Sequence, residues 1–188
     1  MRLGESGDAD LINKLQRRDP DGLTAAYDRY GPMVYSLFLR MTQDQSTAED
    51  LVQELFLRVW NRSRDFNAEK GTLGVWILSV ARNMGLDFVR SARARFKTRM
   101  QPLDKTDDLY LSYKPKEPEL LIDSARLVRE AFANLTADQK RVLELAYFEG
   151  FSQSEIAAQL NAPLGTVKSW MRAALERLRT AVRPGETR

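Results

Sequence analysis

The 188-residue sequence contains neither cysteine nor histidine. The absence of cysteine excludes a disulfide framework, and the two absences together exclude a zinc site built from Cys and His ligands. Histidine is also the usual general base at neutral pH, so an enzyme active site would need another group for that role. A redox signal would have to be sensed by another protein.

Long apolar runs are also missing. No stretch is long enough to span a bilayer, and the N-terminal residues "MRLGESGDADL" lack the apolar centre of a signal peptide. Hydrophobic residues make up 43% of the chain and charged residues 29%, which is typical of a globular protein rather than a disordered one. We therefore expect a cytoplasmic protein that does not insert into a membrane.

Positive charge is concentrated in two segments, although the net charge is only +3. The first segment has Asp87 as its single acid, and its basic residues are Arg82, Arg90, Arg93, Arg95, Lys97 and Arg99. The second has Glu176 as its single acid, and its basic residues are Lys168, Arg172, Arg177, Arg179 and Arg183. Two separate basic helices suit a nucleic acid that is contacted at two places. The alternative is a pair of ordinary solvated helix faces.

Helical periodicity runs through almost the whole chain, and no segment shows the alternation of a strand. The predicted helices span 8–18, 22–40, 47–63, 72–95, 119–133, 137–149, 153–160 and 165–181. The segment "KTRMQPLDKTDDLYLSYKPKEPE" carries three prolines and mixed charge without a period, which is typical of a linker. The sequence thus predicts an all-α fold with two small helical domains, 8–96 and 119–183, joined by a flexible linker over 97–118.

The segment "FSQSEIAAQLNAPLGTVKSWMRAALERLR" has the spacing of a helix-turn-helix. Ser152 and Glu155 form a capping box at the start of the first helix, and Pro163 ends it. Thr166 is the predicted N-cap of the second helix. Another capping box, Thr136 with Gln139, begins a supporting helix with Val142, Leu143, Ala146 and Tyr147 on its apolar face.

The second helix of this motif separates core and outer residues. The residues expected in the core are Val167, Met171, Ala174, Leu175 and Leu178. The opposite side carries Lys168, Ser169, Arg172 and Ala173, whose side chains are of the kinds that reach base edges and phosphates in a major groove. Arg177 and Arg179 continue toward the DNA backbone. This basic outer face favours DNA binding.

The segment "STAEDLVQELFLRVW" predicts a helix with an acidic outer face. Ser46 and Glu49 are its predicted capping box, and the core side is formed by Leu51, Val52, Leu55, Phe56, Val59 and Trp60. The outer side shows Asp50, Gln53, Glu54 and an exposed leucine, Leu57. An apolar side chain among carboxylates suits docking on a basic protein surface, and the alternative is an ordinary acidic solvent face.

The segment "DFNAEKGTLGVWILSVARNMGLDFVR" joins a polar loop to a long helix. Ile77, Ala81, Met84 and Phe88 form an apolar stripe, while Trp76, Ser79, Asn83 and Arg90 lie elsewhere on the helix. An amide beside an indole and guanidinium groups suits contact with an unpaired base. Trp76 is by itself more typical of a core residue.

These segments together resemble a bacterial extracytoplasmic-function sigma factor of the sigma-70 family. The resemblance rests on "YGPMVYSLFLRMTQDQSTAEDLVQELFLRVWNR", "FNAEKGTLGVWILSVARNMGLDFVR" and "LTADQKRVLELAYFEGFSQSEIAAQLNAPLGTVKSWMRAALERLR", which occur in the family's order. It implies a sigma-2 domain and a sigma-4 domain. It also implies a transcription initiation factor that binds core RNA polymerase and promoter DNA, has no catalysis of its own, and needs no metal and no cofactor.

The resemblance assigns roles to the residues singled out above. Asp50, Gln53, Glu54 and Leu57 match the surface that binds the β′ clamp helices, and the β flap is a second expected polymerase contact. Phe66, Asn67, Lys70, Thr72, Asn83 and Arg90 match the part that contacts the minus-ten element, where Asn83 and the loop 65–72 hold a flipped base. Thr166, Lys168, Ser169, Arg172 and Arg177 match the part that reads the minus-thirty-five element.

Family members are often inhibited by an anti-sigma factor, which is a further expected partner. Trp170 departs from the family, which usually has arginine there, so a phosphate contact is either lost or replaced by stacking or packing. Two other readings remain at this stage. An ordinary DNA-binding regulator would need an α/β receiver domain, and a metal-dependent enzyme using Asp50 and Glu54 would need a third carboxylate or a histidine.

Overall fold

The computed structural model describes residues 3–99 and 130–182, with side chains over 7–93 and 130–181. Contacts within the chain divide it into two compact units, Met1–Glu117 and Pro118–Arg188. In the described ranges the regular elements are α-helices and two short 3-10 helices, with no strand. The prediction of an all-α fold with two helical domains is therefore confirmed.

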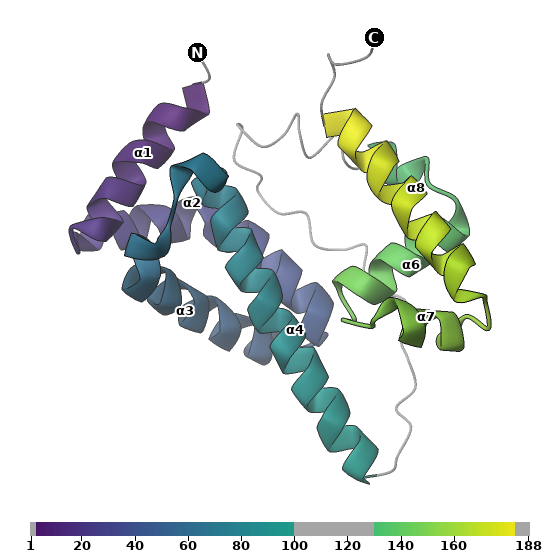
Figure 1. The fold of residues 1–188 in the computed structure, drawn as a ribbon. Helices are drawn as coiled ribbons and strands as arrows, with labels where there is room; N and C mark the ends of the chain where they lie inside the picture. Colours follow the sequence, from purple (N-terminus) through teal and green to yellow (C-terminus); the bar gives the residue numbers. More distant parts are fainter. Residues whose placement is uncertain (1–2, 100–129, 183–188) are drawn as a thin grey trace. The chain divides into compact units, whose positions relative to one another are not determined.

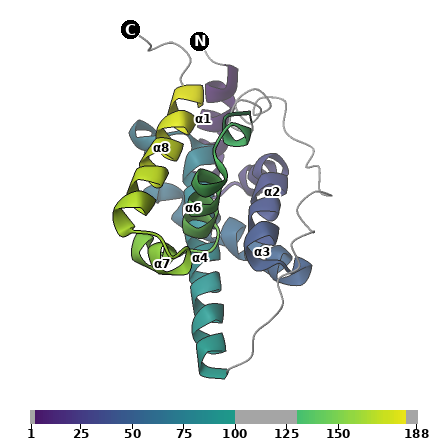
Figure 2. The same ribbon diagram turned by 90° about the vertical axis from the view of Figure 1, so that its right-hand side faces the viewer.

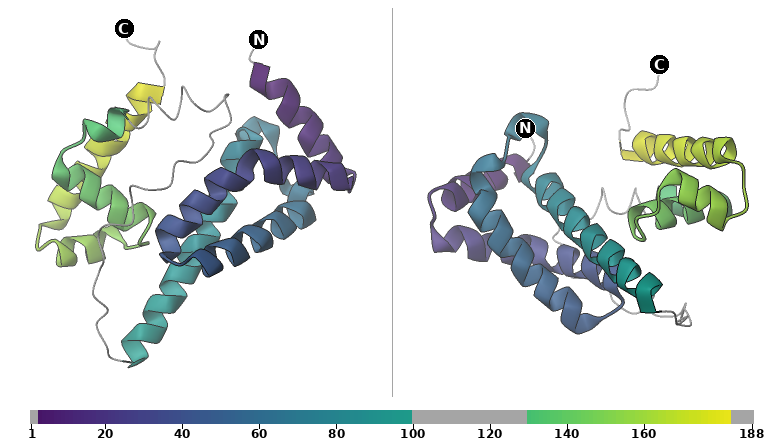
Figure 3. Two further views of the ribbon diagram at one scale, coloured as in Figure 1. Left: turned by 180° about the vertical axis from the view of Figure 1, so that it is seen from behind. Right: turned by 60° about the horizontal axis from the view of Figure 1, so that its bottom comes forward.

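The first unit is built from four helices in the order α1 (Leu3–Gln16), α2 (Pro20–Thr42), α3 (Gln45–Arg62) and α4 (Leu73–Arg99). Two 3-10 helices, η1 (Ser63–Asp65) and η2 (Ala68–Lys70), connect α3 to α4. Helix α2 packs against α1, α3 and α4, and α3 also packs against α4 (Figure 1). The C-terminal part of α4 extends beyond the other helices of this unit (Figure 3).

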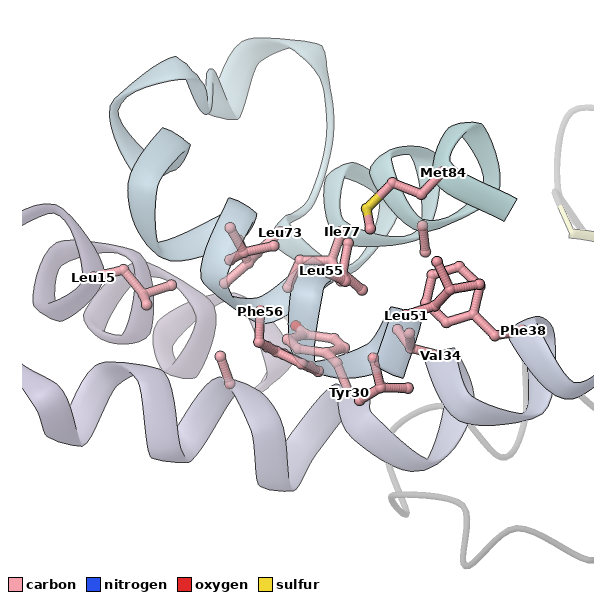
Figure 4. Close-up of a cluster of buried hydrophobic side chains, with 14 of the residues drawn as sticks. Leu15, Tyr30, Val34, Phe38, Leu51, Leu55, Phe56, Leu73, Ile77 and Met84 are labelled. Carbon is pink, nitrogen blue, oxygen red and sulfur yellow. The ribbon is translucent and has the colours of Figure 1, made fainter. Parts of the chain in front are cut away.

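The core of this unit is a continuous cluster of apolar side chains drawn from all four helices (Figure 4). Its fully buried large side chains include Leu15, Val34, Phe38, Leu55, Leu73 and Ile77. Burying one such side chain contributes about 1.5–3 kcal/mol, so this cluster supplies most of the driving force for folding. The apolar stripes predicted for α3 and α4 lie in this core.

Helix α1 is attached to α2 by close backbone packing and by a partly buried polar contact. At Gly22 a Cβ atom would lie 2.7 Å from the Cβ of Lys14, so only glycine permits this approach. The Tyr30 hydroxyl and the Arg29 guanidinium both donate to Oδ1 of Asp8, each at a distance of 2.7 Å. Burial and the hydrogen bond to Asp8 raise the pKa of the Tyr30 phenol, so it stays protonated as a donor.

The start of α3 differs from the prediction. Its N-cap is Asp44, whose carboxylate accepts the Thr47 N–H at 2.8 Å, and not Ser46 paired with Glu49. Hydrogen bonds from the Thr47 side chain and its N–H lower the pKa of Asp44 from its usual 3.8. Because the pKa of Asp44 is lowered in the folded protein, the cap stabilises α3 at pH values above the usual pKa of 3.8. This stabilisation is lost as the pH falls through the lowered pKa of the folded state.

The second unit consists of α6 (Ala137–Tyr147), α7 (Gln153–Gln159) and α8 (Leu164–Val182), preceded by helical residues 130–133. Helix α8 packs against both α6 and α7, which also contact each other (Figure 2). Leu145, Ile156, Val167 and Ala174 are fully buried between them. Two predicted core residues are instead exposed, Leu175 at 50% and Tyr147 at 40%, because each lies at the edge of its apolar stripe.

Residues 100–129 lie outside the described residues. They include most of the predicted linker 97–118 and the first part of the helix predicted over 119–133. The boundaries 8–96, 97–118 and 119–183 remain predictions. Helices predicted over 22–40, 137–149 and 153–160 differ from α2, α6 and α7 by at most a few residues at their ends.

Replacing Ile77 with Ala tests the core of the first unit. We expect the free energy of unfolding to fall by about 2–5 kcal/mol, because the truncation leaves a cavity at a fully buried position. Val75→Ala on the same helix is the matched control, since Val75 is 56% exposed and should change stability by less than about 0.5 kcal/mol. Urea denaturation followed by circular dichroism measures both, and equal effects would contradict the assigned packing.

Candidate polymerase and promoter-DNA surfaces

The outer face of α3 carries the four residues predicted to bind a protein partner. Asp50, Gln53, Glu54 and Leu57 are all exposed, and their spacing places them on one side of the helix. Leu57 is 57% exposed, so the apolar side chain among carboxylates is a real surface feature. Oε1 of Glu54 accepts from Nη2 of Arg58 at 2.8 Å, one turn further along. The structure thus brings the four residues together as predicted.

The end of α3 is held firmly against the turn between α1 and α2. Nη1 of Arg18 donates to the Trp60 carbonyl at 2.6 Å, and its guanidinium lies 5.3 Å from the centre of the Trp60 ring. The fully buried Ser63 hydroxyl donates to the Leu15 carbonyl at 3.2 Å. These contacts fix the point at which the chain leaves α3 and enters the loop 65–72.

Polar residues of that loop shape its backbone. Oδ1 of Asn67 accepts the Glu69 N–H at 2.8 Å and caps η2, and the Thr72 hydroxyl accepts the Val75 N–H at the start of α4. Gly71 has a φ of 147°, a backbone conformation that favours glycine. Lys70 is exposed at the loop surface. Asn67 and Thr72 therefore have structural roles in addition to their predicted DNA contact.

A shallow pocket of about 110 Å³ lies between the end of α3, η1 and α4. Its walls are Arg58, Val59, Arg62, Asp65, Trp76 and Val80. The Nε of Arg62 donates to Asp65 at 2.7 Å across the rim. The Trp76 ring also packs edge-on against Phe66, with ring centres 5.8 Å apart. Sequence reasoning missed Arg58 and Arg62 as members of this site, because they belong to α3 rather than to the loop.

Asn83 continues the face of α4 that borders this pocket. Trp76, Val80 and Asn83 are spaced i, i+4 and i+7, so they lie on one side of the helix. Asn83 does not line the pocket itself but sits about 4.5 Å beyond Val80 along the helix axis and is exposed. Arg90 is also exposed, two further turns along. The face thus presents an amide close to the hollow walled by Trp76, and a guanidinium further along the helix.

The turn between α7 and α8 is closed by backbone hydrogen bonds. Asn161 adopts a φ of 49°, and the Ala162 N–H donates to the Ala157 carbonyl at 3.0 Å, as in a Schellman motif. Helix α7 therefore ends at Gln159, with the left-handed Asn161 just beyond its C-cap Leu160, before the predicted stop at Pro163. Pro163 precedes α8, and its carbonyl accepts the N–H of Val167 at 3.1 Å.

The outer face of α8 presents the predicted DNA-reading residues. Lys168, Ser169 and Arg172 are all exposed and share one side of the helix. Thr166 is not the N-cap that was predicted, because α8 already begins at Leu164, and its side chain is half-buried in the first turn. Trp170 is partly buried and packs against the core of this unit, so its role here is packing.

Arg177 is directed toward its own domain. Its Nη1 donates to the Asn134 carbonyl at 3.2 Å and to Oε1 of Gln139 at 3.3 Å. The same Gln139 oxygen accepts the Thr136 N–H at 3.2 Å in the capping box of α6. Arg177 thus joins the end of α8 to the start of α6, a structural role that the basic pattern did not reveal.

Residues 3–99 and 130–182 lack two features of other function classes. None of the helices there is both long and apolar enough to cross a membrane. In the same residues no group of three or more His, Cys, Asp or Glu side chains is arranged to hold a metal ion, and none includes Asp50 and Glu54.

The chain is similar to known proteins in both of its units. Residues 26–95 match sigma-70 region 2, and residues 125–178 match sigma-70 region 4. An ECF RNA polymerase sigma factor SigK of Mycobacterium ulcerans is 32% identical over 180 residues, covering 95% of this chain and 96% of the relative. SigK of Mycobacterium bovis is 30% identical over 185 residues, covering 96% of each chain.

A solved structure of Rhodobacter sphaeroides SigE in complex with the anti-sigma ChrR is 27% identical. The similarity covers 92% of this chain and 96% of that one, with a TM-score of 0.46.

Replacing Arg177 with Ala tests its structural role. We expect the unfolding free energy of the second unit to fall by about 1 kcal/mol, since the hydrogen bonds to Asn134 and Gln139 are lost. Faster hydrogen exchange at the Gln139 amide should accompany this change. Arg179→Ala, an exposed neighbour, is the control for loss of one positive charge. If both variants keep full stability and only Arg177→Ala weakens DNA binding, its main role is DNA contact.

Proposed function

Because the chain belongs to the extracytoplasmic-function sigma factors of the sigma-70 family, we propose that its exposed helix faces make the successive contacts of transcription initiation. The protein is a transcription initiation factor that directs RNA polymerase to promoters. In the proposal it has no catalysis of its own and acts in the cytoplasm by binding, positioning and strand separation.

The outer face of α3 is the proposed contact with the β′ clamp helices of core polymerase. Asp50 and Glu54 offer carboxylates to a basic partner, and Leu57 offers an apolar anchor that is 57% exposed in the free protein. Interfaces commonly combine a buried apolar anchor with charges that orient the partner. The β flap is proposed to contact the second unit. An anti-sigma factor covering the same α3 face would hold the protein inactive.

The pocket beside α4 is the proposed site for the minus-ten element. A base extruded from the duplex would be held between the loop residue Phe66, the Trp76 wall and Asn83, with Lys70 and Arg90 near the backbone. Support comes from the exposed amide of Asn83 on the same helix face as Trp76 and Val80. Capturing the unpaired base favours strand separation without any chemical step.

The outer face of α8 is the proposed reader of the minus-thirty-five element. Lys168 and Arg172 can donate to phosphates or to guanine, and Ser169 can bond either base type. Thr166, in the first turn of α8, remains a proposed contact as well. Arg177 is proposed to act mainly through the position of α8, given its contacts with Asn134 and Gln139.

The observation that carries this proposal is that α3, α4 and α8 each expose the side chains that the family motifs place in contact with polymerase or DNA. The direct test is run-off transcription by core polymerase on a library of promoter fragments, with and without the protein. New sequence-selective transcripts are expected. Failure to bind core polymerase, with duplex DNA still bound, would favour an ordinary DNA-binding regulator.

Replacing Leu57 with Ala and Glu54 with Gln together tests the α3 face. We expect binding to core polymerase to weaken by about tenfold, since an apolar anchor and a charge are lost from one interface. Duplex DNA binding by the full chain should be unchanged. The matched control, Val75→Ala with Glu69→Gln, removes an exposed aliphatic side chain and a carboxylate from outside α3. Equal weakening by both pairs would argue against the α3 face.

Replacing Asn83 with Ala tests the minus-ten contact. Open-complex formation on a cognate promoter should fall at least about fivefold, the effect of one hydrogen bond, while core binding is retained. Permanganate footprinting of unpaired thymines measures the opening. The control is Ser79→Ala one turn earlier, because the Ser79 hydroxyl already donates to the Val75 carbonyl at 2.7 Å. Unchanged opening in Asn83→Ala would remove this residue from the site.

A further inference from the structure

Arg58 belongs to two surfaces that have been assigned different partners. Its Nη2 donates to Glu54 on the outer face of α3 at 2.8 Å. Its side chain also lines the pocket between α3 and α4 with Arg62 and Trp76. One guanidinium therefore touches both the proposed polymerase-binding face and the proposed single-strand site.

We propose that Arg58 is a further DNA-binding residue, which contacts a phosphate of the single strand at this pocket and which Glu54 restrains in the free protein. When a cationic group of the polymerase pairs with Glu54, Arg58 is released toward the pocket. This inference rests on the proposed function, because it uses the polymerase contact of Glu54 to change the charge of the pocket.

The charges around the pocket support this inference. Each of its two guanidinium groups is paired with a carboxylate, Arg58 with Glu54 and Arg62 with Asp65. In the free protein the pocket and its rim therefore carry little net positive charge. Releasing Arg58 from Glu54 would leave one uncompensated cation beside the Trp76 wall, which is the combination that binds the backbone and a base of a single strand.

The Glu54–Arg58 pair is also suited to exchange. Both side chains are well exposed, 57% for Glu54 and 41% for Arg58, and exposed pairs one helix turn apart are weak. A guanidinium has five N–H donors, so Arg58 can contact a phosphate after only a small rotation of its side chain. Because binding free energies are reciprocal, a strand bound at Arg58 would in turn favour the binding of a cation by Glu54.

The test is a double-mutant cycle on the full-length protein, measuring its binding to a fluorescent oligo(dT) strand by anisotropy across a salt series. Glu54→Gln should raise the affinity about threefold to tenfold at low salt. It should also steepen the plot of log K against log salt by about 0.7, the contribution of one phosphate contact. In the Arg58→Gln background, the same Glu54→Gln change should leave the slope unaltered.

Asp50→Asn is the charge-matched control. It removes one carboxylate from the same face of α3, but Arg58 pairs with Glu54 and not with Asp50. Its slope should equal that of the unmodified protein. The proposal is overturned if Asp50→Asn and Glu54→Gln act alike, if the Glu54→Gln effect persists without Arg58, or if the Glu54→Gln protein fails to bind the strand at low salt.

Binding of the unmodified and Arg58→Gln proteins to core polymerase separates this inference from the proposed function. If both bind the polymerase but the cycle shows no coupling, the Arg58 inference fails and the proposed function stands. If neither binds, the proposed function fails, whatever the cycle shows.

Discussion

The burial of one face of α3 is the constraint on which the first unit depends. Leu55 and Val59 are completely buried against neighbouring helices, so α3 cannot rotate about its axis without exposing them. A helix with a fixed inner face also has a fixed outer face. The direction of Asp50 and Leu57 is therefore determined by core packing, and the carboxylates need no partner within the protein to hold their side of the helix outward.

The same helix also determines where the loop before α4 begins. Ser63 is completely buried and bonded to the Leu15 carbonyl, so the chain leaves α3 at a point fixed by α1. From there the loop reaches α4 through short capped turns. The surfaces proposed for polymerase and for single-stranded DNA thus share one rigid support, and Arg58 lies at their boundary.

Hydrophobic periodicity and capping residues predicted the helices of the described ranges, although not all of their ends, because those signals are local. The capping boxes at Thr136 and Ser152 were predicted and are present. The predicted cap of α3 at Ser46 was wrong, because the Asp44 carboxylate accepts the Thr47 N–H and the cap therefore lies two residues earlier. The prediction that Leu175 lies in the core was wrong, because periodicity defines an apolar stripe but not the width of the surface that covers it.

The outward position of Asp50, Gln53, Glu54 and Leu57 was predictable from the helical pattern, whereas contacts between distant segments were not. The bond from Arg177 to Asn134 joins residues 43 apart, and the pocket walls come from both α3 and α4. No spacing rule places a guanidinium of one helix beside an indole of another. Arg58 was therefore missed as a member of the pocket. Arg177 was interpreted only as a DNA-contacting cation, because its hydrogen bonds to Asn134 and Gln139 cannot be inferred from the sequence.

Trp170 has a consequence for how promoter preference can diversify. Its partly buried side chain packs against the second unit's core, although it lies between the exposed Ser169 and the buried Met171. A large side chain that packs beside the core face of α8 restricts rotation of the helix about its own axis. If α8 reads the minus-thirty-five element as proposed, substitutions at Lys168 or Arg172 would alter base preference while leaving the helix in the same position on its domain, so sequence preference and helix position can vary independently.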